Sequence, residues 1–259
     1  MFASKAAGAA QKTMNSAMEK LSSGMRINNA KDDAAGQGIA TRLTAEITSL
    51  NMASRNASDA QAMIDTAEAA HQEVHAILLR MREIAVQASN GTLSASDRTA
   101  LNAEVTALET EITSIADNTK FAGINLGTGE SVKFQIGTAE GNVLNHTFVD
   151  FDVSSIGANI AVNSVSTATA ALATIDGAIS TVSANRGTLG ALSNRLSSTI
   201  ANLDNISVNL SSARGRIQDT DFAQETSNLA KSQIMQQAAT AMLAQANASK
   251  GSILTLIQG

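Results

Sequence analysis

Apolar residues recur at alternating intervals of three and four between residues 50 and 88. Apart from one histidine, these positions hold small or aliphatic residues: Leu50, Ala53, Ala57, Ala60, Ile64, Ala67, His71, Val74, Leu78, Met81, Ala85 and Ala88. This heptad spacing predicts one face of an α-helix that packs against another helix. With a lead-in from Gly36, the segment predicts a rod roughly 80 Å long, because each residue adds about 1.5 Å.

A second, shorter helix is predicted directly after this rod. Ser89-Asn90-Gly91 has the composition of a helix C-terminus, and Ser94 or Ser96 suits the N-cap of the next helix. The spacing of four and three then continues through Leu101, Val105, Leu108, Ile112 and Ile115. We therefore expect an antiparallel helical hairpin.

The pattern changes between Lys120 and Ser164, where glycines separate short runs that favour β-structure. Val132–Ile136 and Thr147–Val153 are examples of these runs, and four of the six phenylalanines lie in this region. Two or three short strands or hairpins are expected here.

Heptads return from Thr167 to Leu210, and one core position of each heptad is always apolar. The companion position is mixed and includes Arg186, Ser193 and Ser207, which would fix the register of the packed helices at some cost in stability. Together with the first rod, the segment predicts a core and self-assembly seam that comprises Leu50, Ile64, Leu78, Met81, Ile175, Val182, Leu189, Leu196, Leu203 and Leu210.

Two further helices are predicted at the ends of the chain, over Phe2–Ser23 and Phe222–Ile257. The turns Gly24–Gly36 and Arg214–Asp221 would join them to the rods, and the opposite charges of these turns either clamp them together or are simply solvated. No charged residue occurs from Gln233 to Ala248. Such a helix is expected to bury its faces against copies of itself or a partner, through Phe222, Leu229, Ile234, Met242, Leu243, Leu254 and Ile257.

Composition narrows the possible functions. The 259 residues include 47 alanines but no Pro, Cys, Trp or Tyr, so long helices are permitted and thiol chemistry is excluded. The net charge of −5 gives no basic surface for nucleic acid. Neither a run of 18 apolar residues nor a cleavable signal peptide is visible, so no membrane insertion is expected.

The one weak candidate for a metal site is the pair His71 and His75, which stand four residues apart on the first rod. The sequence His-Gln-Glu-Val-His lacks the glutamate that directly follows the first histidine in zinc proteases, and His71 occupies a heptad core position. A metalloenzyme thus remains only as an alternative to a core histidine. We expect no catalytic residues, no metal and no cofactor.

Several segments, in order, resemble those of bacterial flagellins. The turn Leu21–Gly36 resembles the family's turn signature almost letter for letter, and Arg80–Gly91 and Asn209–Ala223 are similarly close. Further matches are Ala53–Asp59, Asn118–Asn125, Gln233–Ala239 and Leu243–Asn247. The chain is therefore identified as a member of this family.

The resemblance implies a mainly α fold: a long antiparallel coiled-coil-like helical bundle rod with a small β-hairpin region. Three domains are expected. The first is an N-terminal inner-core helix and connector (1–35), and the last is a C-terminal connector and inner-core helix (212–259). Between them, the central rod helices with the β-region (36–165) and the C-terminal rod helix (166–211) form one domain. About 45 residues separate the matched helices, which indicates a short form without large outer domains. Family members have roughly 20 more residues before Phe2, so an N-terminal truncation is expected.

The function that the resemblance implies is a structural subunit that polymerises with itself into the bacterial flagellar filament, after export without a cleaved signal peptide. An export chaperone, the filament cap and hook-associated proteins are the implied partners. Arg80, Ile84 and Glu104 match the flagellin patch that a vertebrate Toll-like receptor recognises, although contacts between protofilaments would also explain them. The alternatives are a hook-filament junction protein and a cell-surface adhesin that does not polymerise.

Overall fold

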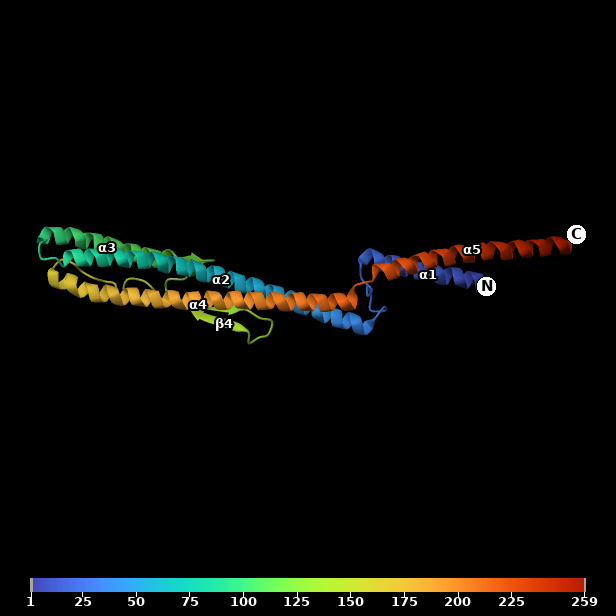
Figure 1. Ribbon diagram of the computed structural model, residues 1–259, viewed down its shortest axis with the longest axis horizontal. Coiled ribbons are helices and arrows are strands. Elements are labelled where there is room, and N and C mark those ends of the chain that lie inside the picture. Colours follow the sequence, from blue (N-terminus) through green and yellow to red (C-terminus); the bar gives the residue numbers. More distant parts are fainter. Residues whose placement is uncertain (1, 259) are drawn as a thin grey trace. The chain divides into compact units, whose positions relative to one another are not determined.

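The computed structural model describes the backbone of residues 2–258 and the side chains of residues 2 and 4–249. Within this part of the chain, helices dominate, and the strands form two small antiparallel pairs (Figure 1). In order, the elements are α1 (Phe2–Ser23), α2 (Ala34–Ala88), α3 (Ala95–Asn118), β1 (Lys120–Phe121), β2 (Ile124–Asn125), β3 (Ser131–Gln135), β4 (Val143–Thr147), α4 (Val165–Gln218) and α5 (Phe222–Gln258). The predicted mainly α rod with a small β-region is confirmed.

The chain contains two compact units. Unit 1 comprises Met1–Ile47 and Val208–Gly259, and unit 2 comprises Thr48–Ser207. The sequence-based domain boundaries, at 35/36 and 211/212, fall within the helices α2 and α4. The contacts within the chain also divide it inside these two helices, at 47/48 and 207/208.

Unit 2 is built on the packing of α2 against α4, which lie side by side in Figure 1 with α3 beside α2. The seam positions Leu50, Ile64, Leu78, Met81, Ile175, Val182, Leu189, Leu196 and Leu203 are all buried, and Leu210, which belongs to unit 1, is half-buried. Alanines fill much of the remaining interface, so the helix backbones can approach closely. Heptad periodicity thus located the core of the rod correctly.

The turn between α2 and α3 is fixed by polar contacts at both helix ends. Ser94 caps α3 in a reciprocal capping box with Asp97, as one of the two serine alternatives predicts. The buried Arg98 donates from Nε to the carbonyl of Ala88 and from Nη2 to that of Asn90, each over 3.0 Å. This arginine therefore bonds to a carbonyl at the end of α2 and to one in the turn that follows it.

The two strand pairs are hairpins, of which only the first has a tight turn. A turn with positive φ at Ala122 and Gly123 joins β1 to β2, the geometry that matches the right-handed strand twist. In the second hairpin, β3 pairs with β4 from Ser131 opposite Thr147 to Gln135 opposite Val143.

The predicted strand Thr147–Val153 is wrong, because β4 ends where the sequence pattern would start it. The amide of Phe148 still bonds to the carbonyl of Glu130 beyond β3, but the chain then leaves the hairpin. Phe148 and Phe151 are both buried in the unit 2 core. These aromatic residues therefore serve to attach the segment to the helices rather than to pair as a strand.

The predicted turn Arg214–Asp221 is largely wrong, because α4 continues through Gly215 to Gln218. A glycine lowers helix stability by only about 1 kcal/mol, which a long packed helix tolerates. Within unit 1, the connector after α1 bonds to this end of α4: the amide of Arg26 donates to the carbonyl of Gln218 (2.7 Å), and its Nη2 donates to that of Ile217 (2.6 Å). The two connectors are thus joined through backbone carbonyls, and the arginine lies at the negative end of the helix dipole.

In unit 1, α1 and α5 pack along each other. Small residues from both helices, Ala10, Ala17, Ser232 and Ala239, are buried between them. The interface also contains a hydrogen bond from Gln236 to Gln11 and an ion pair between Lys20 and Glu225. Small buried residues permit close contact but bury little apolar area.

Among the described residues, α4 alone is long and apolar enough to cross a membrane by length and composition, with an 18-residue window of mean hydropathy 1.2. This is weak evidence for a span, because the core helix of a bundle has the same properties. Ile175 and Val182 of α4 are indeed buried against the other helices of unit 2.

Shortening a seam residue should destabilise unit 2 strongly. Leu196→Ala removes a fully buried side chain, so we expect the free energy of unfolding to fall by about 2–5 kcal/mol. Leu79→Ala, which makes the same chemical change at a half-exposed position on α2, should cost much less. Urea denaturation followed by circular dichroism measures both values, and equal losses would contradict the packing described above.

Candidate assembly surfaces

A series of polar contacts runs along the edge of the α2–α4 seam. Ser54 donates to Asp204 over 2.9 Å, and one heptad further along α2, Gln61 donates to Ser197 over 3.3 Å. A step of one heptad forward in α2 is therefore matched by a step of one heptad backward in α4. The same antiparallel register also holds for the pairs Asn51–Ser207, Asp65–Ser193 and Arg82–Asp176.

The polar residues that interrupt the α4 heptads each contact α2. Arg186 donates twice to Glu68, from Nε over 2.9 Å and from Nη2 over 2.7 Å. Ser193 and Ser207 are members of the edge series. A shift by one heptad would separate the Arg186–Glu68 charges, so these contacts favour a single register.

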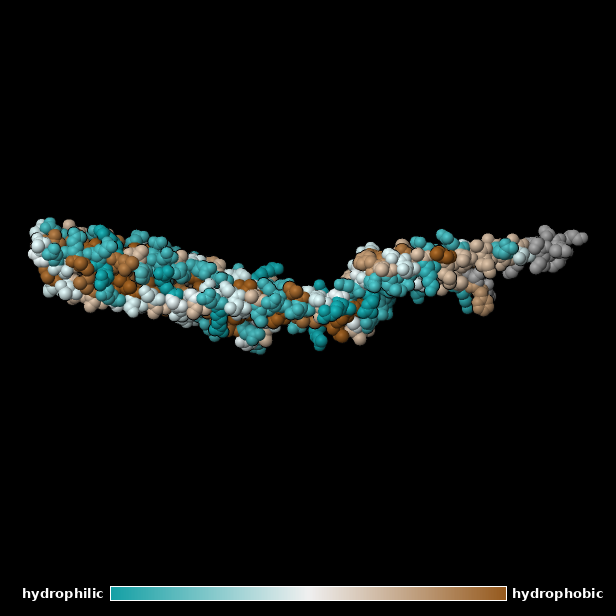
Figure 2. Space-filling view, viewed as in Figure 1, coloured by the Kyte–Doolittle hydropathy of each residue, from teal (hydrophilic) through white to brown (hydrophobic). Residues whose placement is uncertain are grey.

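The exposed face of α5 carries several of the predicted assembly residues. Ile234 and Met242 are each 66% exposed, and Phe222 is also exposed. Figure 2 shows weakly hydrophobic side chains, coloured tan, along this helix. Leu229 and Leu243 are half-buried, whereas the side chains of Leu254 and Ile257 lie outside the described residues.

Sequence reasoning missed Met235, which is 52% exposed. It precedes Met242 by one heptad and therefore lies on the same face of α5. Its spacing from Met242 is the signal that could have identified it. Together, Ile234, Met235 and Met242 form what we call the α5 apolar face.

Arg80 and Glu104 meet on the surface between α2 and α3. The guanidinium donates to Glu104 Oε1 over 3.1 and 2.8 Å and also to Glu83 over 3.1 Å. The bonds from Glu104 and Glu83 raise the pKa of Arg80 above its ordinary value. Both partners of the Arg80–Glu104 pair remain about half-exposed.

Ile84, the third residue of the expected receptor patch, does not lie at this surface. Its side chain is 1% exposed and belongs to the core that α2, α3 and α4 share. Because α3 and α4 cover two sides of α2, the buried stripe of α2 is wider than a single seam. A spacing of four residues from Arg80 therefore did not place Ile84 at the surface.

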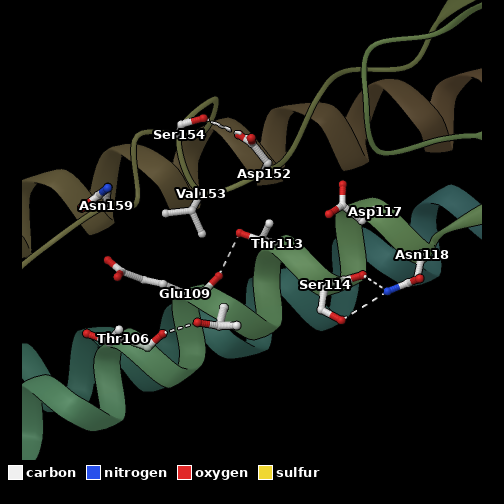
Figure 3. A pocket seen from close by; sticks show the side chains of 11 residues that line it. Thr106, Glu109, Thr113, Ser114, Asp117, Asn118, Asp152, Val153, Ser154 and Asn159 are labelled. Atoms are coloured by element: carbon white, nitrogen blue, oxygen red, sulfur yellow. Dashed lines mark hydrogen bonds between the residues drawn. The ribbon is translucent and has the colours of Figure 1, made fainter.

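An open groove of about 620 Å³ lies between α3 and the segment 152–159 (Figure 3). Its polar side chains bond mainly within their own elements, as in the bonds from Ser154 to Asp152 and from Asn118 to Ser114. The hydrogen bond that the backbone amide of Ser155 donates to Asp152 lowers the pKa of this carboxyl group. Glu109 accepts a hydrogen bond from the amide of Ile160 (2.7 Å), and this bond attaches the segment to α3.

His71 is a core residue, as its heptad position indicates. It is 1% exposed, its Nδ1 bonds to the carbonyl of Ala67 over 2.9 Å, and its ring contacts Phe151. Burial lowers the pKa of His71, because the charged ring would lose its hydration. Within residues 2–258, no group of three or more His, Cys, Asp or Glu residues is arranged to hold a metal ion.

A rod of heptad-packed helices, with an apolar and weakly charged terminal helix, defines a structural, self-associating class of protein. Comparison with known families specifies this class. Residues 1–131 match the bacterial flagellin N-terminal helical region, and residues 172–257 match the bacterial flagellin C-terminal helical region. The chain therefore belongs to the bacterial flagellin family.

Individual relatives agree with this assignment. The flagellin of Halalkalibacterium halodurans is 43% identical over 247 residues, which cover 93% of this chain and 91% of that protein. The flagellin of Bacillus subtilis is 39% identical over 278 residues, with the same two coverages. A crystal structure of Bacillus cereus flagellin superposes with a TM-score of 0.54 at 32% identity, over 57% of this chain and 88% of that one.

The protein is thus a structural subunit of the bacterial flagellar filament, an extracellular assembly that flagellins form with themselves. The two matched regions contain α1, α2 and α3 in full and most of α4 and α5. The segment between them is short and consists largely of the β-region's second hairpin and the chain that attaches it to the rod.

Acid should destabilise the protein through His71. The unfolded ring takes up a proton near pH 6.5, whereas the native ring has a lower pKa and stays neutral, so stability falls as the pH drops below about 6.5. The fall attributable to His71 is at most about 2 kcal/mol between about pH 7.5 and about pH 5, the limit for a native ring that never protonates.

Urea denaturation at the two pH values measures this effect. His71→Leu should reduce the loss of stability between them, whereas His75→Leu, at a half-buried position on the same helix, should retain it. If His71→Leu loses as much stability between the two pH values as the parent protein does, the pH dependence arises from another group.

Proposed function

We propose that the subunit polymerises through unit 1, with the α5 apolar face as its principal contact. Ile234, Met235 and Met242 are each more than half exposed in the isolated chain, on a helix with almost no charge to keep it hydrated. A contiguous exposed apolar surface of this kind favours contact with another protein surface. If one copy presents this face to a different surface of the next copy, the contact repeats without closing and generates a filament.

Unit 2 supplies a second contact in this proposal. Leu79 and Val86 stand one heptad apart on α2, and each is nearly half-exposed. Neither is needed for the seam with α4, so both are available to a neighbouring rod. The fixed α2–α4 register would hold these side chains at a constant spacing along the filament.

Family membership supports further partners: an export chaperone, the filament cap and hook-associated proteins. It also supports export without a cleaved signal peptide. The role is structural, and neither catalysis nor a cofactor is part of the proposal.

Recognition by a Toll-like receptor is a separate part of the proposal, carried by Arg80 and Glu104. Their side chains pair at the surface of unit 2 and are accessible in the isolated chain. A receptor surface could contact the pair together, while buried Ile84 would act only by supporting α2 from below.

The assembly proposal predicts that polar substitutions on the α5 apolar face block polymerisation. The double variant Met235→Ser/Met242→Ser should join filaments at least about tenfold more slowly, because two methionines lose the benefit of burial. Labelled monomer is added to short seeds sheared from native filaments, and the sedimented fraction is measured over time.

Val165→Ser serves as the matched control, since it makes a similar change at an exposed position in unit 2. Circular dichroism confirms that both variants remain helical. Incorporation of the double variant at the parental rate would refute the role of this face.

The receptor proposal predicts that Arg80→Ala lowers signalling potency by about tenfold in receptor reporter cells, as expected for a charged contact of moderate importance. Arg82→Ala is the control, because Arg82 is similarly exposed and forms its ion pair with Asp176 instead. Identical dose-response curves for Arg80→Ala and the parent would exclude this site.

A further inference from the structure

A small, partly open cavity lies in unit 2, where the second hairpin meets the two long helices. Its volume is about 200 Å³, and residues from α2, from β4 with the segment after it, and from α4 surround it: His71, His146, Phe148, Asn185, Thr188 and Leu189. An apolar cavity of about 150 Å³ is already large enough to hold benzene. A molecule with one ring therefore fits this space.

Three residues that line this cavity each carry a buried polar atom with no hydrogen-bond partner among the described residues. The atoms are His71 Nε2, His146 Nε2 and Asn185 Nδ2. Unpaired buried polar atoms cost free energy and are uncommon in native proteins. Three such atoms from three elements at one cavity indicate a place where a bound molecule would supply the missing partners.

The hydrogen-bond capacity of these atoms can be read from their surroundings. Because Nδ1 of His71 faces the carbonyl of Ala67, it carries the proton, so Nε2 of the neutral ring is an acceptor. Asn185 Nδ2 is a donor. The cavity therefore offers at least one acceptor and one donor, a combination that matches a hydroxyl group.

The apolar part of the lining disfavours charged ligands. Phe148 and Leu189 are buried and apolar, so an ion would lose its hydration without adequate replacement. The nearest charges to His71, Glu68 and Arg186, neutralise each other in an ion pair. Two histidines without a third metal-binding side chain also fall short of the usual metal site.

We propose that this cavity is a binding site for a small neutral aromatic alcohol, of which phenol is the simplest example. The ligand hydroxyl donates to His71 Nε2 and accepts from Asn185 Nδ2, and the ring packs against Phe148 and Leu189. His146 Nε2 provides a second polar contact on the hairpin side. Binding would link the hairpin to both long helices, so the bound ligand stabilises unit 2.

Calorimetric titration of the full chain with phenol and with benzene tests this site. Phenol should bind in a saturable manner and about tenfold more tightly than benzene, because only phenol pairs with the polar atoms. Asn185→Leu should weaken phenol binding by about tenfold without weakening benzene binding. Long-range ¹H–¹⁵N spectra of the histidine rings should show phenol-dependent shifts at His71 and His146.

A blocking variant provides an independent check. Thr188→Trp places a large side chain at the edge of the cavity from an exposed position, and it should abolish phenol binding. Thr181→Trp is its control: this threonine stands one heptad earlier on α4, is likewise exposed, and makes the same kind of bond to the fourth preceding carbonyl.

Three results would overturn the proposal. They are the absence of saturable phenol binding, which would leave water as the occupant, equal affinities for phenol and benzene, and unchanged binding by Thr188→Trp. Failure of filament assembly would have no bearing on this site, because the titrations use the monomeric chain.

Discussion

Close antiparallel packing of α2 against α4 is the interaction on which unit 2 depends. Alanines at many seam positions bring the helices together, and larger residues such as Leu78 and Leu196 fill the space that remains. Apolar packing of this kind is nearly indifferent to a shift by one heptad. The polar contacts at the edge, above all Arg186 with Glu68, remove that ambiguity because a shifted register would leave charges unpaired.

The rest of unit 2 covers this helix pair from different sides. The helix α3 packs on one end of α2, while the second hairpin attaches through Phe134, Leu144 and Phe148 near the middle. The α3 covering buries Ile84, which explains why a residue next to the exposed Arg80 is inaccessible. The second hairpin packs less completely against the two long helices. The cavity lined by His71, His146 and Asn185 lies where they meet.

Unit 1 follows the opposite principle, since its helices bury little between themselves and leave apolar side chains exposed on α5. A chain with one well-packed unit and one incompletely covered unit is suited to a filament subunit. In the proposed assembly, the terminal helices would acquire the rest of their buried surface from other copies. Placing the apolar surface at the contact makes burial itself the driving force for polymerisation.

The sequence by itself determined the presence of the helices, the apolar seam and the family, and it narrowed the α3 cap to Ser94 or Ser96, because each depends on local periodicity or on a local motif. It did not determine where β4 ends, how far α4 continues beyond Leu210, that Ile84 is buried, or that three residues with unpaired polar atoms line one cavity. Those features depend on which segments pack against each other, and residues far apart in the chain, such as His71 and Asn185, carry no local signal of their proximity. Only the tertiary structure decided them, because burial is set by all the neighbours of a residue and not by its own helix alone.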